Sequence, residues 1–328
     1  MKLAFQEKFS EKIVSNKISN LSNIILETSE QAAIACYDWI GKGDNKSADA
    51  AAVKSMRQTL NNSAISGVVV IGEGERDEAP MLYIGEEVGQ GGVEVDIALD
   101  PLEGTTICAN AGESALAVIA FANKGCFLNA PDVYMDKIAI GGGLPQGIID
   151  LDNSPSQNLK NLAQAKKCNV SDLTAMILER PRHQELIAKT REAGARVRLI
   201  GDGDVAGVIS CSNPESKIDI YMGIGGAPEG VLAASALKTI DGQMMGRLIF
   251  DNNQKQIDRA KKMGIKDLNK KYFVNDLAKG DVLFACSGVT DGYMLRGVKK
   301  SPNLIMVNSL IMDSATKKIT NFNSKFFQ

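Results

Sequence analysis

The segment Asp100-Pro-Leu-Glu-Gly-Thr-Thr106 places two acids, a glycine and two hydroxyl side chains close together. It follows an alternating apolar run over 93–99, which predicts a β-strand with a period of two residues. We therefore expect Asp100 at the carboxyl end of that strand, where Pro101 ends the ladder. Glu103 would turn toward the same point as Asp100, and two carboxylates so placed suit a hard divalent cation.

Backbone groups in the same segment suit an anion. Gly104 permits close approach of the backbone. If a helix begins here, the N–H groups of Gly104, Thr105 and Thr106 would direct partial positive charge toward a phosphate. An acid pair beside such an anion site predicts metal-assisted phosphate chemistry. The alternative is an Asp-Pro turn followed by an ordinary helix cap, which would be favoured for a lone Asp-Pro dipeptide.

The composition predicts a globular chain and argues against several classes of partner. The chain has 328 residues, 44% apolar and 23% charged, enough for one large α/β domain or two fused halves. Its net charge of -2 gives no support for nucleic acid or an anionic membrane as the main partner. No apolar run approaches the roughly 20 residues that cross a bilayer. The six cysteines form no CxxC pair, so we expect a cytoplasmic protein.

The chain contains a single histidine, His183, which removes several mechanisms. A multi-histidine zinc site within one chain is impossible, and a Ser-His-Asp triad would have to use this residue. Strong acid–base or metal chemistry must therefore rely mainly on carboxylates. We expect His183 itself to be a structural or surface residue.

Two predicted helices precede the acidic segment. Apolar residues at helical spacing predict a helix over 23–40 and a second over 48–60, with Ser47 as the N-cap of the second. Asp49 falls on the inward face of the second helix. The other residues of that face are Val53, Met56 and Leu60. An acid in a first turn either binds a ligand or is stabilised by the helix dipole alone, and the sequence leaves both open.

Four acids each follow a strand-like run and precede a turn or helix. They are Glu73, Asp100, Asp202 and Glu229, after the runs 67–71, 93–99, 195–200 and 218–222. In open α/β sheets, ligands bind beyond the carboxyl ends of the strands, so we expect these acids to collect in one site. The competing explanation for Glu73 is a solvated charge run. Convergence of the four acids favours a multi-metal centre.

The glycine-rich loop over 223–230 has a rival interpretation as a dinucleotide-binding fingerprint. It fails that pattern because the third small position, counted from Gly223, is Pro228, and no P-loop GKS or GKT occurs in the chain. Pro228 instead suits the first turn of a helix, with Glu229 beside it.

A series of short motifs occurs in order between about Gln31 and Leu310. They are GDNKSAD at 43–49, VIGEGE at 70–75, APMLYIGE at 79–86, DIALDPLEGT at 96–105, APDVY at 130–134, PRH at 181–183, DGD at 202–204 and GGAPEG at 225–230. Together they closely resemble the class II fructose-1,6-bisphosphatase family. The Asp-Pro-x-Glu/Asp-Gly-Thr element alone is shared by the wider inositol monophosphatase-like superfamily, so the complete series is what makes the resemblance specific.

The resemblance implies an α/β fold of the layered αβαβα sugar-phosphatase type. It implies gluconeogenic hydrolysis of the 1-phosphate of fructose 1,6-bisphosphate to fructose 6-phosphate, with two or more Mn²⁺ or Mg²⁺ ions. Carried over by motif, Asp49 and Glu73 would bind one metal ion. The second ion would be bound by Asp100, Glu103 and Glu229. The substrate would contact Glu103, Gly104, Thr105, Tyr134, Arg180, Arg182, Asp202, Asp204 and Gly226.

The implied mechanism is an in-line displacement by a metal-activated water. Thr105 would orient that water, and either Asp49 or Glu73 could accept its proton. The arginines and Tyr134 would bind the distal 6-phosphate. A sedoheptulose bisphosphate differs from the fructose compound by one hydroxymethylene unit and stays open as a substrate. A non-catalytic regulator that binds metal or sugar phosphate is the remaining alternative.

The chain departs from the family in two places. Many relatives have Gly-Asp-Lys or Gly-Glu-Lys before Asn-Thr-Ala-Asp, whereas this chain reads Asn-Lys-Ser over 45–47, so the family lysine is not assigned here. Arg180 stands where some relatives have lysine, and arginine can bind phosphate through two hydrogen bonds.

We expect two α/β halves after an N-terminal extension over 1–22, which has no clear family counterpart. The half over 23–165 would carry most metal ligands, and the half over 166–328 the sugar-phosphate contacts and Glu229. We also expect a homo-oligomer, a dimer or a tetramer, with a small sugar bisphosphate as ligand.

Overall fold

The computed structural model describes residues 18–74, 80–213 and 216–327, and the structural statements below concern these residues. The α-helices are α2 (Ser22–Cys36), α3 (Asn45–Asn61), α4 (Thr105–Ala109), α5 (Pro155–Lys166), α6 (Gln184–Glu192), α7 (Asp204–Ser210), α8 (Ala227–Thr239), α9 (Gln254–Lys262) and α10 (Val274–Leu277). Short 3-10 helices are η1 (Ser19–Leu21), η2 (Tyr37–Trp39), η3 (Val170–Asp172) and η4 (Pro181–His183).

The strands form two sheets. Sheet one, with eight strands, contains β1 (Ile65–Ile71), β2 (Glu87–Val88), β3 (Val93–Glu103), β4 (Leu116–Ala122), β11 (Val282–Gly288), β12 (Lys299–Ser301), β13 (Leu304–Asp313) and β14 (Lys318–Phe327). Sheet two, with six strands, contains β5 (Tyr134–Ile140), β6 (Thr174–Leu178), β7 (Arg196–Ile200), β8 (Ile220–Gly226), β9 (Gln243–Ile249) and β10 (Tyr272–Phe273).

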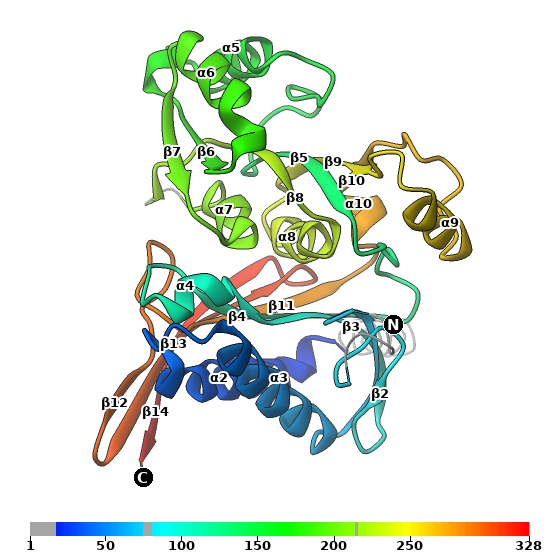
Figure 1. Ribbon diagram of the computed structural model, residues 1–328, viewed down its shortest axis with the longest axis vertical. Coiled ribbons are helices and arrows are strands. Elements are labelled where there is room, and N and C mark those ends of the chain that lie inside the picture. Colours follow the sequence, from blue (N-terminus) through cyan, green and yellow to red (C-terminus); the bar gives the residue numbers. More distant parts are fainter. Residues whose placement is uncertain (1–17, 75–79, 214–215, 328) are drawn as a thin grey trace, which may run out of the picture.

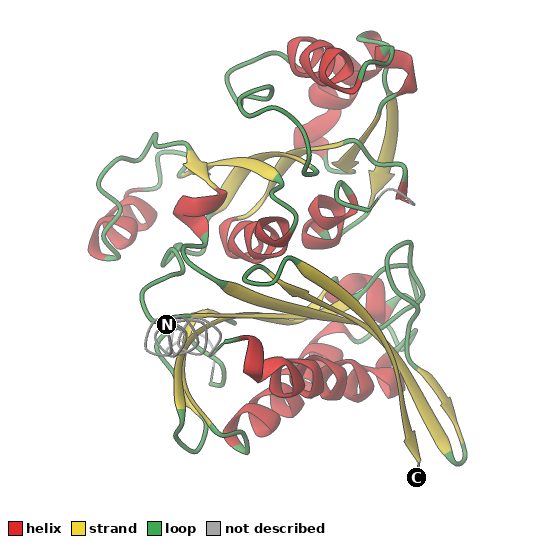
Figure 2. Cartoon of the chain, turned by 180° about the vertical axis from the view of Figure 1, so that it is seen from behind, coloured by secondary structure: helices red, strands yellow, loops and turns green. Residues whose placement is uncertain are grey.

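Helices and sheets alternate through the molecule in the expected αβαβα order (Figure 1, Figure 2). Helices α5 and α6 lie on the outer side of sheet two, α7 and α8 lie between the sheets, and α2 and α3 cover the outer face of sheet one. The predicted layered α/β fold is thus confirmed. No helix in the described part of the chain is long and apolar enough to cross a membrane.

Strand order shows how the chain passes between the two sheets. Sheet one has the order β12-β13-β11-β4-β3-β1-β2, with β14 paired to β13. Sheet two has the order β10-β9-β5-β8-β6-β7. Strand β5 belongs to the first half of the chain but lies in sheet two. Strands β11 to β14 belong to the second half but lie in sheet one. The expected halves, 23–165 and 166–328, consequently share both sheets.

Within each sheet, parallel strands have their C-terminal ends at the same edge. In sheet one β1 pairs in parallel with β3, and in sheet two β6 pairs in parallel with both β7 and β8. The predicted acids follow or end four of these strands: Glu73 after β1, Asp100 near the end of β3, Asp202 after β7 and Glu229 after β8.

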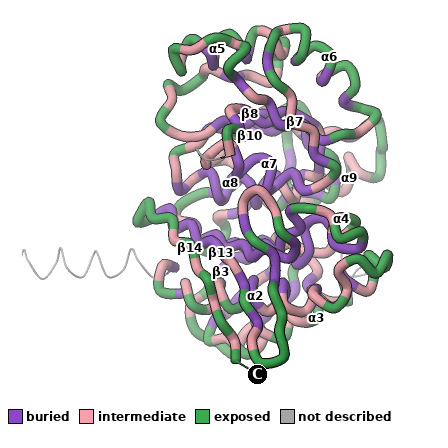
Figure 3. Tube along the Cα trace, turned by 90° about the vertical axis from the view of Figure 1, so that its left-hand side faces the viewer, coloured by how far each residue is buried: buried purple, intermediate pink, exposed green. Residues whose placement is uncertain are grey.

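The apolar core is deepest in the layer between the sheets (Figure 3). Helix α8 has no exposed residue, and its apolar side chains extend all round it, which is the pattern of a fully buried helix. Val231, Leu232 and Leu237 of α8 share one cluster with Val118 of β4 and Phe284 of β11. A second cluster joins α2 and α3 to sheet one, and a third joins α5 to sheet two. Because α8 is held on every side, the acid in its first turn has a well-defined position.

Several predicted boundaries need correction. Helix α2 and η2 confirm the helix expected over 23–40, but α3 begins at Asn45, and its N-cap is Asp44 rather than Ser47. The Asp44 side chain accepts a hydrogen bond from the Ser47 backbone N–H at 3.0 Å. Aspartate and serine are both good N-cap residues, and here the aspartate caps the helix. Strand β8 continues to Gly226, so 223–226 is strand and not loop.

The expected N-terminal extension over 1–22 is described only from residue 18. That part contains η1, the first residue of α2, and the buried side chains of Ile18 and Leu21. Both side chains belong to the apolar cluster of α2 and α3. Residues 1–17 lie outside the described part of the chain.

Candidate active site

Two adjoining cavities are lined by residues from both sheets. The acidic cavity, of about 300 Å³, is bordered by Asp49, Glu73, Asp100, Glu103, Asp132, Asp202 and Glu229 among others. The arginine cavity, of about 200 Å³, is bordered by Tyr134, Arg180, Arg182, Asp204 and Gly226 among others. Glu103, Asp202 and Glu229 border both cavities, so the two form one continuous site.

An irregularity in β3 brings Asp100 and Glu103 to the same cavity. In a regular strand, residues three apart face opposite sides of the sheet. The register of β3 against β4 shifts between Asp100 and Glu103, so this interval does not follow the regular alternation. The Asp100 carboxylate accepts a hydrogen bond from the Leu102 N–H at 3.1 Å, which closes the turn. The expectation that Pro101 ends the strand was wrong, since β3 resumes pairing at Glu103.

Asp49 and Glu73 approach the acidic cavity from α3 and from the loop after β1. Because α3 begins at Asn45, Asp49 lies beyond the first turn, where the helix dipole no longer accounts for an acid. The Glu73 N–H donates to the Leu82 carbonyl at 3.1 Å, which holds the start of this loop. Glu73 is therefore a partly buried cavity residue and not part of a solvated charge run.

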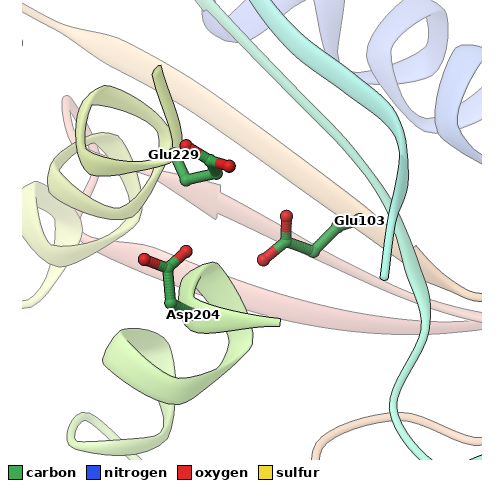
Figure 4. A group of neighbouring side chains, drawn as sticks. All are labelled: Glu103, Asp204 and Glu229. Carbon is green, nitrogen blue, oxygen red and sulfur yellow. The ribbon is translucent and has the colours of Figure 1, made fainter. Parts of the chain in front are cut away.

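The side chains of Glu103, Asp204 and Glu229 point toward one another (Figure 4), and all three border the arginine cavity. One oxygen from each of Glu103, Asp204 and Glu229 lies within 4.8 Å of the others. Glu103 accepts a hydrogen bond from the Val205 N–H of α7 at 3.0 Å, which ties sheet one to this helix. Asp204 begins α7, and Glu229 lies in the first turn of α8, after Pro228.

Burial, and then repulsion between neighbouring acids, raises the pKa of four glutamate and aspartate carboxyls that border the acidic cavity. Burial, followed by the charges of Asp100 and Asp49, raises the pKa of Glu73 to about 8. Burial is also the main cause that raises the pKa of Asp100 to about 6 and of Glu229 to about 7. The pKa of Glu103 lies well above its ordinary value, because of burial and then the charge of Asp100.

The donor set fits divalent cations. The Glu229 Oε2 atom is buried and has no hydrogen-bond partner among the described residues, which is costly for a carboxylate unless a cation binds it. Several more carboxylate oxygens line the same cavity, and a hard cation such as Mn²⁺ or Mg²⁺ prefers such ligands. Cation binding would offset the burial cost and the repulsion that together raise these pKa values.

The arginine cavity carries positive charge and an open aromatic ring. The Arg182 guanidinium donates to the Ile224 carbonyl at 2.8 Å and lies 4.7 Å from the centre of the Tyr134 ring. Arg180 donates to the Asp202 carboxylate at 3.2 Å and to the Gly201 carbonyl. Tyr134 is 49% exposed, so its ring is accessible from solvent. This arrangement suits a phosphate group bound near the surface.

His183 holds the backbone behind Arg182. Its ring is buried; Nδ1–H donates to the Leu178 carbonyl at 2.7 Å, and Nε2 accepts from the Ile224 N–H at 2.8 Å. Burial lowers the pKa of His183, and the hydrogen bonds are those of the neutral ring. The structural role expected for His183 is confirmed.

Every site residue predicted from the sequence borders one of the two cavities, and their individual roles stay predictions. Lys137, whose ammonium group hydrogen-bonds the Asp204 carboxylate, was missed, as was the grouping of Asp204 with Glu103 and Glu229. A signal for Lys137 exists: it shares one strand face with the apolar residues Met135 and Ala139. A charged residue on an apolar face predicts a buried partner.

A family model and the curated relatives of this chain carry the same enzyme name. A family model described as bacterial fructose-1,6-bisphosphatase, glpX-encoded, matches residues 19–326. A fructose-1,6-bisphosphatase 1 class 2 from Escherichia coli (strain K12) is 45% identical over 309 residues, covering 90% of this chain and 91% of that protein. A D-fructose 1,6-bisphosphatase class 2/sedoheptulose 1,7-bisphosphatase from Trichodesmium erythraeum (strain IMS101) is 43% identical over 318 residues, covering 89% and 92%.

Among solved structures, inositol monophosphatase from Anabaena (Nostoc) sp. PCC 7120 matches with a TM-score of 0.32 and 15% identity. The match covers 66% of this chain and 80% of that one.

Proposed function

The chain belongs to the glpX-encoded bacterial fructose-1,6-bisphosphatase family, and we propose that it hydrolyses the 1-phosphate of fructose 1,6-bisphosphate in gluconeogenesis. The observation that carries this proposal is the junction of the two cavities. One offers carboxylates for metal ions beside the reacting phosphate, and the other offers arginines for a second phosphate. A substrate with one phosphate at each end of a sugar fits this division of charge.

The acidic cavity would hold the metal ions. Asp49 and Glu73 would bind one ion, and Asp100, Glu103 and Glu229 another, with Mn²⁺ or Mg²⁺ as the candidates. Bound divalent ions supply charge neutralisation at the phosphate and lower the pKa of a coordinated water. The carboxylate oxygens that line the cavity support this assignment, as does the Glu229 oxygen that lacks a hydrogen-bond partner within 18–74, 80–213 and 216–327.

Residues at the edge of the acidic cavity would orient and deprotonate the attacking water. Thr105 is the first residue of α4 and borders the cavity together with Glu103 and Gly104. Its hydroxyl would hold the water by a hydrogen bond. Asp49 or Glu73 would accept the proton, and both border the same cavity.

The arginine cavity would select the substrate. Arg180 and Arg182 would bind the 6-phosphate, with Tyr134 packed against it. Asp202 and Asp204 would accept hydrogen bonds from sugar hydroxyls, with Gly226 leaving space beside them. Gly226 has no room for a side chain, because a Cβ there would lie 1.7 Å from the Glu229 Oε2 atom.

Phosphate release tests the proposal. Purified protein with Mn²⁺ or Mg²⁺ should release phosphate from fructose 1,6-bisphosphate, and a chelator should stop the reaction. Sedoheptulose 1,7-bisphosphate belongs in the same panel, because several relatives are named for both substrates. No release from any sugar bisphosphate, with metal present, would support a binding protein instead.

We further propose that the enzyme acts in the cytoplasm as a homo-oligomer. All six cysteines are free thiols, which suits a reducing compartment. Light scattering during size-exclusion chromatography would measure the number of subunits.

A further inference from the structure

Lys137 is a buried lysine outside the set of residues assigned to the proposed reaction. It lies in β5 with 1% of its surface exposed. Its ammonium group donates to Asp204 Oδ2 and to the Gly226 carbonyl, the latter at 2.7 Å. Lysine is almost never fully buried unless it is paired, so the Asp204 carboxylate is the counter-ion that keeps Lys137 in place.

The neighbouring strands leave space for this ion pair. The register partners of Lys137 are Gly223 in β8 and Gly246 in β9, so neither strand places a side chain beside it. A Cβ at Gly225 would lie 1.9 Å from Asp204 Oδ2 and 3.0 Å from Lys137 Nζ. The glycine-rich segment of β8 therefore admits the lysine and the aspartate together.

The ion pair with Lys137 distinguishes Asp204 from the two other residues of the three-carboxylate cluster, Glu103 and Glu229. Glu103, Asp204 and Glu229 are close enough to share one cation. An oxygen of Asp204 is already occupied by the Lys137 ammonium group, whereas Glu229 Oε2 has no hydrogen-bond partner in the described part of the chain. An ammonium group beside Asp204 also repels a second cation.

We propose that Lys137 is a positioning residue that keeps Asp204 out of the metal ligand set and holds its carboxylate for the substrate. The proposal rests on the proposed function, and it assigns a separate role to each residue of the three-carboxylate cluster. Glu103 and Glu229 bind the cation, and Asp204 accepts hydrogen bonds from the sugar.

The variant Lys137→Met keeps the aliphatic stem and removes the charge. Asp204 is then free to join the metal ligands, so Mn²⁺ titrated into the metal-free protein should bind more tightly, by about tenfold. The KM for fructose 1,6-bisphosphate should rise by roughly 10- to 100-fold, because the Asp204 carboxylate would no longer accept its hydrogen bond from the sugar. Isothermal titration calorimetry and steady-state kinetics measure the two changes.

A merely structural role predicts a different result, since loosened packing would weaken metal binding and substrate binding together. Unchanged or weaker Mn²⁺ binding, or an unchanged KM, would overturn the proposal. The matched control is Lys166→Met, which removes a lysine–aspartate pair with Asp219 elsewhere in the fold and should alter neither value.

If Lys137→Met does not fold, the double variant Lys137→Met/Asp204→Asn restores a neutral pair. It should fold, bind Mn²⁺ as the wild type does and still show the raised KM, while a wild-type KM would refute the positioning role. Absence of turnover in the wild type would instead sink the proposed function, and the Mn²⁺ titration would still test Lys137.

Discussion

The two cavities of the site differ in burial and in charge. The acidic cavity carries buried acids such as Glu103, which is 4% exposed and whose pKa is raised by burial. The arginine cavity carries half-exposed side chains such as Tyr134. Burial strengthens electrostatic interactions where bonds would break, and exposure lets a charged substrate be captured before it is fully desolvated. The contrast predicts that mutations in the acidic cavity change turnover and mutations in the arginine cavity change affinity.

The largest expected effect is from Glu103→Gln in the acidic cavity. The variant retains the shape of the side chain but removes a charge from the proposed metal site, so kcat should fall by roughly a thousandfold or more. Because the native carboxyl is buried with a raised pKa, the amide should leave thermal stability intact. The matched control is Glu94→Gln, an exposed glutamate of the same strand. Near-normal phosphate release from Glu103→Gln would break the comparison.

A smaller effect is expected from Arg182→Met in the arginine cavity. KM for fructose 1,6-bisphosphate should rise by roughly 10- to 100-fold with a lesser change in kcat, because a charge-assisted hydrogen bond to the distal phosphate is lost. Fructose 1-phosphate, which lacks that phosphate, should show no such change. Arg196→Met, at an exposed arginine of β7, serves as the control. Equal loss with both substrates would contradict the assignment of Arg182 to the 6-phosphate.

The pH dependence of stability should distinguish the metal-free protein from the metal-bound protein. Glu73 has a folded-state pKa of about 8 against an ordinary value of 4.5, so the folded chain binds more protons than the unfolded chain between these values. Stability of the metal-free protein should therefore fall as pH rises through this window. Asp100 and Glu229 act in the same direction, up to about pH 6 and 7.

Thermal unfolding in the presence of a chelator, from pH 5 to 8, measures this slope. Glu73→Gln should flatten it, and excess Mn²⁺ should raise stability most at the alkaline end, where the carboxylates are charged. A metal-free protein that becomes more stable across the window would show that these carboxyls are not held as the structure indicates.

The smallest effect is expected from Asp44→Ala, an acid that lies close to Asp49 in sequence but outside both cavities. Its carboxylate caps α3, so the variant should lower the melting temperature slightly and leave kcat and KM unchanged. Ser47→Ala should have a still smaller effect, since Ser47 is not the N-cap. A loss of activity in Asp44→Ala would mean that acids outside the cavities also take part.

Much of this site could be predicted because its residues follow short local patterns. Alternating apolar residues predict β3, and helical spacing predicts α2 and α3. The four acids expected after strand ends all border the acidic cavity. These patterns depend on residues adjacent in sequence, whose geometry is set by the backbone period. The competition between Asp44 and Ser47 for the N-cap was missed because both are good caps within one short segment.

Residue identity and spacing alone indicated most of the elements around the site and the acids and arginines that border its two cavities. Only the tertiary structure decided that the irregularity in β3 brings Asp100 and Glu103 to one cavity, and that Asp204 lies close to Glu103 and Glu229. It also decided that Lys137 meets Asp204, 67 residues away in the chain. The physical reason is that such distances depend on strand order and register between remote segments, which no local period specifies.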